Sequence, residues 1–382
     1  MTRELVILGS TGSIGVQALE IVDANPSLFT VTAISAAGSN PDVLIEQAKR
    51  FKVKTVGVAR NAQAIRDALP GVQVIDGPNA STEIAAIKCD VVLNGITGSI
   101  GLAPTLAAID AGNRVALANK ESLVAGGDLV ISRAKDDQLL PVDSEHSAIW
   151  QALVGENKSE ISKLILTASG GPFRDRTDLS TVTLQEALAH PTWAMGPVVT
   201  INSASLMNKG LEIIEAHYLF GIPYSQIEAV IHPQSVVHSM VEFVDGSTIA
   251  QGSPPNMKGP ISLAINFPNR VPGATQPIDW KTSHTWNFAP IDENRFPAVA
   301  LARRCGEIGG GLPAIFNASN EVGVQAFING EISFTTIIDI VSATVENLQS
   351  SGAQKLRDLS DVSAIEEDAR RIALEQVKKV SA

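Results

Sequence analysis

The first third of the chain alternates short apolar runs with helical patterns, and this alternation restricts the fold more than any other feature. The runs ELVIL (4–8), KTVGVA (54–59), DVVLNG (90–95) and RVALAN (114–119) have the length of strands, and segments with helical spacing lie between them. Strands that alternate with helices form parallel sheets whose crossover helices cover both faces. We therefore expect an α/β domain built on a doubly wound parallel sheet.

A glycine-rich turn, GSTGSIG (9–15), joins the first apolar run to an amphipathic segment. A strand, a glycine turn and a helix together expose backbone N–H groups at a helix start, where a pyrophosphate can bind. The spacing is GxxGxxG rather than GxGxxG, so a tight turn without a ligand is the alternative. The next turn, AAGSN (36–40), lacks the acid that binds a ribose 2′-hydroxyl and contains no Arg or Lys. This favours a Rossmann-like domain that binds NADP rather than NAD.

Polar residues follow the later strands of the expected sheet. Gly95–Gly98 and Asn119–Ser122 come directly after apolar runs, and ligands of such sheets bind at the carboxyl ends of strands. Lys120 stands between a strand end and a helix start. We expect it to contact a phosphate or a hydroxyl, with an ordinary surface lysine as the alternative.

Two acidic residues, Asp143 and Glu145, occur in PVDSEHSAIWQ (141–151), with His146 beside them. Residues i and i+2 of an extended strand point to the same side, so we expect both carboxylates to face one small volume. Oxygen ligands suit a hard divalent ion such as Mg²⁺ or Mn²⁺. A solvated acidic turn is the alternative.

Two loops in the middle of the chain carry residues suited to a substrate site. SGGPFR (169–174) follows a strand pattern, and its glycines allow the backbone to approach an anion closely. HPTWAMGP (190–197) carries Trp193 and Met195 between prolines and a glycine. Such a loop fits either a core segment or a lid that closes over a substrate.

The segments that follow combine apolar patterns with polar residues. SLMNKGLEIIEAHYLF (205–220) has helical spacing, and Asn208, Lys209 and Glu212 share one narrow face. This trio suits either a ligand site or an ordinary Lys–Glu surface pair. IHPQSVVHSMVEF (231–243) is expected to be one strand carrying His232 and His238.

These patterns divide the 382 residues into four parts. We expect a Rossmann-like dinucleotide-binding domain over 1–145, an α+β catalytic domain over 146–260 with a lid loop at 190–197, a linker over 261–290 and a C-terminal α-helical bundle over 291–382. Residues 254–297 have weak periodicity and are expected to form a long connection. Ser363–Glu366 resembles a capping box. The expected C-terminal helices cover 298–309, 313–329, 333–349 and 361–380.

Charge and cysteine content argue against several classes of protein. The net charge of −11 disfavours nucleic-acid and acidic-membrane partners, which need a positive field. The two cysteines, Cys89 and Cys305, are too few for a disulfide framework. No apolar run is long enough to cross a bilayer, and no leader segment precedes the first expected strand. We expect a cytoplasmic protein without nucleic-acid or membrane partners.

Together the motifs resemble those of the 1-deoxy-D-xylulose 5-phosphate reductoisomerase family. The resemblance implies an NADPH- and divalent-metal-dependent oxidoreductase. Such an enzyme rearranges the sugar phosphate 1-deoxy-D-xylulose 5-phosphate (DXP) and reduces it to 2-C-methyl-D-erythritol 4-phosphate, in isoprenoid precursor biosynthesis by the methylerythritol phosphate pathway. It also implies a homodimer. The motifs that carry it, from residue 4 to the carboxyl-terminal helices, are GSTGSIG, LANKESLV (117–124), PVDSEHSAIWQ, SGGPFR, HPTWAMG, MNKGLEIIEA (207–216) and HPQSVVHSMVEF.

The resemblance also implies the residues of each site. Among the implied catalytic residues, Lys120 and Glu145 handle protons, whereas His190 and His232 order the pocket and lid. The implied ligands of Mg²⁺ or Mn²⁺, with Co²⁺ as a further candidate, are Asp143, Glu145 and Glu212. The implied substrate contacts are Lys120, Ser144, Glu145, Ser169, His190, Trp193, Ser203, Asn208, Lys209 and Glu212. The implied cofactor contacts are Thr11, Gly12, Ser13, Ile14, Gly38, Ser39, Asn40, Asn119, Glu121 and Gly196.

One departure and two alternative functions stay open at this point. Many family members have a basic residue in place of Ser39, so the strength of the NADPH preference is open. A semialdehyde dehydrogenase would need a nucleophilic cysteine at a helix start or beside a base. Cys89 precedes an apolar strand and Cys305 lies among the C-terminal helices, which counts against it. A non-catalytic NADP sensor would lack the three acids, which are all present.

Overall fold

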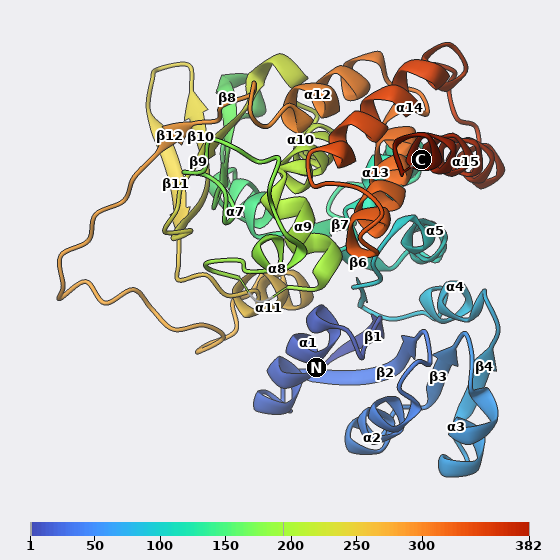
Figure 1. Ribbon diagram of the computed structural model, residues 1–382. Helices are drawn as coiled ribbons and strands as arrows, with labels where there is room; N and C mark the ends of the chain where they lie inside the picture. Colours follow the sequence, from blue (N-terminus) through green and yellow to red (C-terminus); the bar gives the residue numbers. More distant parts are fainter. Residues whose placement is uncertain (1, 194, 382) are drawn as a thin grey trace. The chain divides into compact units, whose positions relative to one another are not determined.

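The computed structural model describes residues 2–193 and 195–381, which belong to two compact units (Figure 1). Unit 1 comprises residues 1–122, 130–147 and 256–276. Unit 2 comprises residues 123–129, 148–255 and 277–382. The four-part division expected from the sequence stays a prediction. No helix among the described residues combines the length and the apolar character needed to span a membrane.

Unit 1 is built on a parallel sheet in the order β4-β3-β2-β1-β5-β6-β7, which confirms the doubly wound α/β prediction. Chain order reverses between β1 and β5, the position at which such sheets bind ligands. Central strands have to be apolar on both faces, and β1 is buried from Leu5 to Leu8. The strands are β1 (Arg3–Leu8), β2 (Phe29–Ala36), β3 (Thr55–Val58), β4 (Gln73–Asp76), β5 (Val91–Asn94), β6 (Arg114–Leu117) and β7 (Leu139–Pro141).

Helices connect these strands, as the alternating pattern predicts, and α6 and α7 contain residues of both units. The helices are α1 (Ser13–Ala24), α2 (Pro41–Phe51), α3 (Ala62–Ala68), α4 (Ala80–Ala85), the 3₁₀ turn η1 (Ser99–Gly101), α5 (Leu102–Asp110), α6 (Glu121–Ile131), α7 (Ser144–Ala152) and α11 (Lys258–Asn266).

Unit 2 combines a mixed sheet, in the order β11-β10-β8-β9-β12, with the C-terminal helices. Strands β8 and β9 are parallel and the other pairs are antiparallel. Its strands are β8 (Ile161–Ala168), β9 (Ile227–Ile231), β10 (Val237–Phe243), β11 (Thr248–Gly252) and β12 (Ala289–Pro290). Its helices are η2 (Lys158–Glu160), α8 (Leu184–Ala187), α9 (Pro197–Ala204), α10 (Met207–Phe220), η3 (Tyr224–Gln226), α12 (Ala298–Ile308), α13 (Leu312–Ile328), α14 (Thr336–Gly352) and α15 (Leu359–Ser381).

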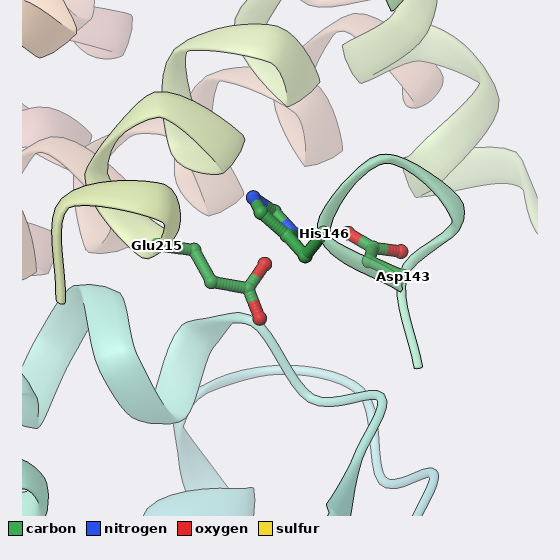
Figure 2. A group of neighbouring side chains, drawn as sticks. All are labelled: Asp143, His146 and Glu215. Carbon is green, nitrogen blue, oxygen red and sulfur yellow. Dashed lines mark ion pairs between the residues drawn. The ribbon is translucent and has the colours of Figure 1, made fainter. Parts of the chain in front are cut away.

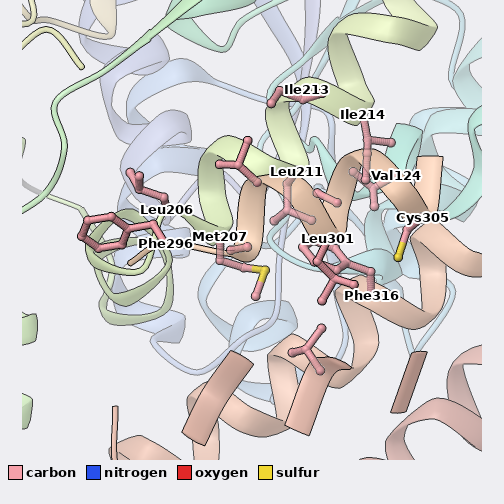
Figure 3. Packing of buried hydrophobic residues seen from close by; sticks show 14 of the residues in the cluster. Val124, Leu206, Met207, Leu211, Ile213, Ile214, Phe296, Leu301, Cys305 and Phe316 are labelled. Carbon is pink, nitrogen blue, oxygen red and sulfur yellow. The ribbon is translucent and has the colours of Figure 1, made fainter. Parts of the chain in front are cut away.

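Helix α10 lies in the apolar core of unit 2. Its residues Leu211 and Ile214 belong to one buried cluster with Leu301 of α12 and Phe316 of α13 (Figure 3). A Cβ atom on Gly210 would lie 2.7 Å from the Cβ of Ala302, so the glycine lets α10 and α12 approach closely. The position of α10, which carries three predicted site residues, is therefore fixed by packing on all sides.

The acidic stretch is not one extended strand, contrary to the sequence prediction. Strand β7 ends at Pro141 and α7 begins at Ser144, so Asp143 and Glu145 do not alternate as strand residues. The Asp143 carbonyl accepts a hydrogen bond from Ser147 N–H at 2.8 Å, which is a helical bond. An acid in the first helical turn interacts favourably with the helix dipole, and this explains why the helix starts here.

Three further predictions about elements were wrong. Residues 231–243 form two strands, with His232 in the turn between them, because Pro233 has no N–H for a sheet bond. The expected long connection 254–297 contains α11, an almost wholly buried helix. Ser363–Glu366 is not a capping box at a helix start, because α15 begins earlier, at Leu359.

Candidate active site

The glycine turn after β1 presents an open helix start. Gly9 has a φ of +73°, and a Cβ atom there would lie 2.8 Å from the carbonyl oxygen of Gly95, so the turn packs directly against the end of β5. Gly12 precedes α1 and supplies no side-chain cap. The first N–H groups of α1 are therefore not bonded to a capping side chain, as an anion-binding helix start requires. Thr11, Gly12, Ser13 and Ile14 all lie in this turn, partly or fully exposed.

A cation lies at the turn after β2, although residues 36–40 contain none. The Nη2 atom of Arg60, which follows β3, donates a hydrogen bond to Ser39 Oγ at 2.5 Å. The Asn61 side chain donates to the carbonyl of Gly38 at 2.8 Å. Arg60 was not among the predicted site residues, because it lies outside the turn 36–40. The sequence could have indicated Arg60, because it follows β3, which neighbours β2, and both strands end at the same edge of a parallel sheet.

Asn119 shapes a loop at the same edge of the sheet. Its Nδ2 donates to the carbonyls of Ile96 and Gly98 at 2.8 and 2.9 Å, and also to Glu121 Oε2 at 2.9 Å. Its Oδ1 accepts from Ser122 N–H at 3.0 Å. The side chain is thus engaged in holding the loop after β5, and a direct contact of Asn119 with the cofactor stays a prediction.

Lys120 and Asp143 form an ion pair at the ends of neighbouring strands β6 and β7, with 2.5 Å between Nζ and Oδ2. Their side chains are 11% and 19% exposed, so water screens the pair only weakly. Ser144 Oγ donates to Glu145 Oε2 at 2.6 Å. His146 is fully buried, with Nδ1 3.9 Å from Asp143 Oδ2; Figure 2 shows Asp143 and His146 at the start of α7. Oxygen donors and a lysine therefore gather at this edge.

The third predicted acid, Glu212, is buried within unit 2. Its carboxylate accepts hydrogen bonds from Asn208 Nδ2 and Lys209 Nζ. Glu212 is 2% exposed and Lys209 is 3% exposed, so the pair is not the ordinary surface pair that the sequence left open. Glu215, one turn further along α10, is also fully buried (Figure 2). Buried carboxyl groups are costly unless partners compensate them, so this face of α10 is a candidate functional surface.

Ser169, His190 and Ser203 converge on one point. The His190 Nε2 atom lies 3.0 Å from Ser169 Oγ and 3.1 Å from Ser203 Oγ. His190 Nδ1 accepts from the N–H groups of Thr192 and Trp193, at 3.1 and 2.8 Å. Because Nδ1 is an acceptor, the ring proton of neutral His190 is on Nε2, where it faces the two hydroxyl groups.

Arg174 supplies positive charge beside this cluster and was not among the predicted site residues. Its Nη1 donates to the Ser169 carbonyl at 3.4 Å. Burial lowers the pKa of His190, and the charge of Arg174 lowers it further. A neutral histidine, two hydroxyl groups and a guanidinium are donors suited to a phosphate.

Gly171 explains why SGGPFR packs against α9. It has a φ of +63°, and a Cβ atom there would lie 2.9 Å from the carbonyl oxygen of Ser203. Its N–H donates to Ser169 Oγ at 3.2 Å. The absence of a side chain thus brings Ser169 next to Ser203, two residues that are 34 positions apart in the sequence (203 − 169).

Contacts of His190 and Trp193 hold the first half of the loop 190–197. The indole of Trp193 lies 6.1 Å from the imidazole ring of His238, centroid to centroid. A Cβ atom on Gly196 would have no atom within 4 Å, and the residue is exposed. A lid that closes over substrate stays a prediction for this loop; its residue 194 lies outside the described residues.

His232 is fully buried in the turn between β9 and β10, with both ring nitrogens engaged. Nδ1 lies 2.9 Å from the carbonyl oxygen of Asn287, and Nε2 accepts from the N–H groups of Val236 and Val237. These bonds hold the turn between β9 and β10, and the implied role of His232 in ordering the pocket and lid stays a prediction.

The two cysteines lack the surroundings of a nucleophile. Both are buried and free, and burial raises the pKa of each thiol to about 12. Because the thiolate is the reactive form, this counts against the cysteine chemistry of a semialdehyde dehydrogenase.

Comparisons with known proteins agree over the whole chain. The family profile "1-deoxy-D-xylulose 5-phosphate reductoisomerase" matches residues 5–127, its C-terminal domain matches 139–220, and "DXP reductoisomerase C-terminal domain" matches 253–372. The reductoisomerase of Kitasatospora griseola is 55% identical over 382 residues, covering 97% of this chain and 99% of the relative. The chain belongs to the 1-deoxy-D-xylulose 5-phosphate reductoisomerase family.

Other relatives and solved structures support the same family. The reductoisomerase of Streptomyces avermitilis is 52% identical, covering 97% of each chain. The Zymomonas mobilis reductoisomerase in complex with NADPH aligns with a TM-score of 0.92 at 39% identity, over 99% of this chain and 100% of the other. A DOX-P reductoisomerase crystal structure with NADPH, fosmidomycin and magnesium gives 0.94 at 37% identity, over 99% of each chain. The predicted fold class is therefore confirmed.

Proposed function

We propose that this chain rearranges DXP and reduces it to 2-C-methyl-D-erythritol 4-phosphate, using NADPH and a divalent metal, as a step in isoprenoid precursor biosynthesis by the methylerythritol phosphate pathway. The observation that carries this proposal is the Lys120–Asp143 pair, which lies at the same edge of the sheet as the open glycine turn. A nicotinamide nucleotide, a metal and a proton donor are needed together for this reaction. That edge offers groups suited to each.

The cofactor is proposed to bind along the carboxyl edge of the unit 1 sheet. The open N–H groups at the start of α1 suit the pyrophosphate. Ser39, Asn40 and Arg60 suit a ribose 2′-phosphate, because a guanidinium and a hydroxyl form charge-assisted bonds with it. When bound, NADPH supplies the hydride. The chain contributes orientation and the exclusion of water.

A divalent cation is proposed to be held by Asp143, Glu145 and Glu212. The fit rests on donor chemistry, because all three are carboxylates and Mg²⁺ and Mn²⁺ prefer oxygen ligands. Each lies among polar partners that already compensate negative charge, namely Lys120, Ser144 and the Asn208–Lys209 pair. When bound, the metal acts as a Lewis acid toward the carbonyl and hydroxyl oxygens of the sugar.

Lys120 and Glu145 are proposed to handle protons. The Lys120 ammonium is held by Asp143 at the point where substrate hydroxyl groups would bind, so it can donate a hydrogen bond or a proton to a developing alkoxide. Glu145 accepts from Ser144, which orients its carboxylate. His190 orders the loop through Nδ1 and presents its Nε2 proton to the substrate side.

The substrate phosphate is proposed to bind Ser169, His190 and Ser203, next to Arg174. Asn208 and Lys209 complete the substrate contacts from the start of α10. This donor set explains how a chain with a net charge of −11 binds an anion: local donors replace a general positive field. Trp193 and Gly196 are the proposed lid residues over that site.

We also propose a homodimer and a cytoplasmic location. A second copy would cover the aromatic strap 277–288, in which Trp280 is 70% and Phe288 45% exposed. Large exposed aromatic groups are typical of interfaces. Light scattering should give twice the mass of the chain, and Trp280→Glu should lower that mass toward the monomer. A monomeric wild type would contradict the dimer. The buried, free thiols of Cys89 and Cys305 suit a reducing compartment.

The test of the proposed function is NADPH oxidation on mixing the purified protein with DXP, with Mg²⁺ or with a chelator. The proposal predicts turnover that stops with chelator and falls at least 100-fold in Glu145→Gln, because a group that acts on protons contributes ~10²–10⁴-fold. Glu228→Gln, which changes a carboxylate paired with Lys163, is the matched control and should keep wild-type activity. A wild type that consumes no NADPH with any metal would overturn the proposal.

A further inference from the structure

A buried amide pair joins the C-terminal helices to the helix that carries Ser203. Asn320 Nδ2 of α13 donates a hydrogen bond to Asn202 Oδ1 of α9, at 3.0 Å, across 118 residues of sequence. Asn320 is 1% and Asn202 6% exposed. Neither residue belongs to the proposed substrate contacts, and the sequence patterns did not single out either of them.

Apolar contacts also hold α9. Ile201 and Ala204, the residues on either side of Asn202 and Ser203, are fully buried in the main core of unit 2. Phe316 and Val324, one turn before and after Asn320 on α13, are also fully buried. Apolar contacts are not directional, so they hold α9 in place without fixing its rotation about its own axis. The amide bond is directional and fixes that rotation.

Stability alone does not explain the hydrogen-bonded pair of Asn202 and Asn320. Asn320 Oδ1 is buried and has no hydrogen-bond partner among the described residues. A buried polar atom without a partner costs free energy, so two apolar side chains of the same shape would suit a purely structural contact better.

Helix α13 provides a fixed reference for this bond. Thirteen of its 17 residues are buried. Glu321, next to Asn320, accepts hydrogen bonds from Asn317 at 3.0 Å and from Arg370 of α15 at 2.8 Å. The Asn320 side chain therefore projects from a helix that is held by both apolar packing and ion pairs.

Rotation of α9 would move a residue of the phosphate cluster, which consists of the proposed phosphate contacts Ser169, His190 and Ser203. Ser203 follows Asn202 directly, so its direction is set by the same rotation, about 100° further around the helix. Its hydroxyl lies 3.1 Å from His190 Nε2. A rotation of α9 would change that distance, whereas the glycine turn of unit 1 contains no residue of α9.

We infer that Asn202 and Asn320 are positioning residues that aim Ser203 at the substrate phosphate, which gives the C-terminal helices a part in substrate binding. The inference rests on the proposed function for the identity of the ligand. It concerns orientation, because neither amide touches the cluster itself.

The test compares Asn320→Ala, Asn202→Ala and the double variant in the full-length protein. We expect KM for DXP to rise about 3- to 10-fold in each single variant, which is on the order expected for one lost neutral hydrogen bond. KM for NADPH should stay unchanged. The double variant should be no worse than either single one, because both remove the same contact. Ser319→Ala is the matched control. Ser319 is buried next to Asn320, but its hydroxyl bonds only carbonyls of its own helix, and its KM values should stay at wild type.

A second readout does not depend on turnover. The ring-nitrogen NMR signals of His190, assigned with His190→Gln, should shift in both Asn variants and stay unchanged in Ser319→Ala. If the wild type fails to convert DXP, the proposed function fails, and these signals still decide the positioning. Unshifted signals, additive effects in the double variant, or an equal KM change in Ser319→Ala would overturn the inference. Asn320→Ser, which keeps a donor hydroxyl, replaces Asn320→Ala if that variant does not fold.

Discussion

Arg60 brings a cation to the turn 36–40, the proposed 2′-phosphate site, whose own residues contain none. Arg60→Gln removes the charge next to Ser39, so we expect KM for NADPH to rise about 10- to 150-fold, because a hydrogen bond to a charged group contributes ~1.5–3 kcal/mol. KM for DXP should stay unchanged. Arg66→Gln is the control, since Arg66 pairs with Asp76 elsewhere in unit 1. Steady-state kinetics measure both constants. An unchanged KM for NADPH in Arg60→Gln would remove Arg60 from the proposed 2′-phosphate site.

His190 should make stability depend on pH below neutrality. Burial and then the charge of Arg174 lower its pKa below the ordinary value of 6.5. The folded state therefore binds the proton more weakly than the unfolded state. The resulting contribution to stability is complete above about pH 6.5 and is lost as the pH falls toward the lowered folded pKa.

His190→Gln should flatten the dependence of Tm on pH in that window. Calorimetry between about pH 5 and 7.5 measures the slope for wild type, for His190→Gln and for His284→Gln, a change at an exposed histidine. The last variant should keep the wild-type slope. If His190→Gln keeps it as well, the histidine does not titrate as its burial implies.

At the scale of elements, the turn 169–174 and α9 both contribute to the proposed phosphate site, through Ser169 and Ser203. Gly171→Ala adds the strain of a positive φ, about 1–2 kcal/mol, and a clash with the Ser203 carbonyl. We expect a lower Tm and a raised KM for DXP. Gly155→Ala has the same kind of φ but open space around the Cβ, so it should lower Tm without changing KM. Equal KM values in the two variants would show that close packing of Gly171 on α9 is irrelevant to binding.

The parallel sheet and the C-terminal helices were predictable, because their apolar runs and helical periods are long and regular. The residues at which a helix or strand starts or ends were not predictable where one local hydrogen bond decides them. Residues 141–151 look extended by pattern, yet the Asp143 carbonyl closes a helical turn on Ser147. The pattern placed His232 in a strand, but β9 ends at Ile231, before Pro233.

Site residues that follow a strand could be found in the sequence, whereas those that act across elements could not. Lys120 and Asp143 were predictable because each follows a strand of one sheet. Arg60 and Arg174 act beside other turns, and Asn320 lies 118 residues from its partner. Such pairs depend on tertiary packing, which local patterns in one sequence do not encode.

For the whole molecule, the proposal assigns one divalent ion to three carboxylates, those of Asp143, Glu145 and Glu212. Removing any one of them should weaken binding of the same ion, because each would supply an oxygen ligand.

The most direct measurement is Mn²⁺ binding, followed by electron paramagnetic resonance in the presence of NADPH, for wild type, Asp143→Asn, Glu212→Gln and the control Glu228→Gln. We expect one tightly bound Mn²⁺ per chain in the wild type and in Glu228→Gln. Binding should be at least tenfold weaker in Asp143→Asn and in Glu212→Gln, because one carboxylate ligand contributes ~1.4 kcal/mol or more. Wild-type Mn²⁺ affinity in Glu212→Gln would contradict the proposed site, because the ion would then be held without its third carboxylate.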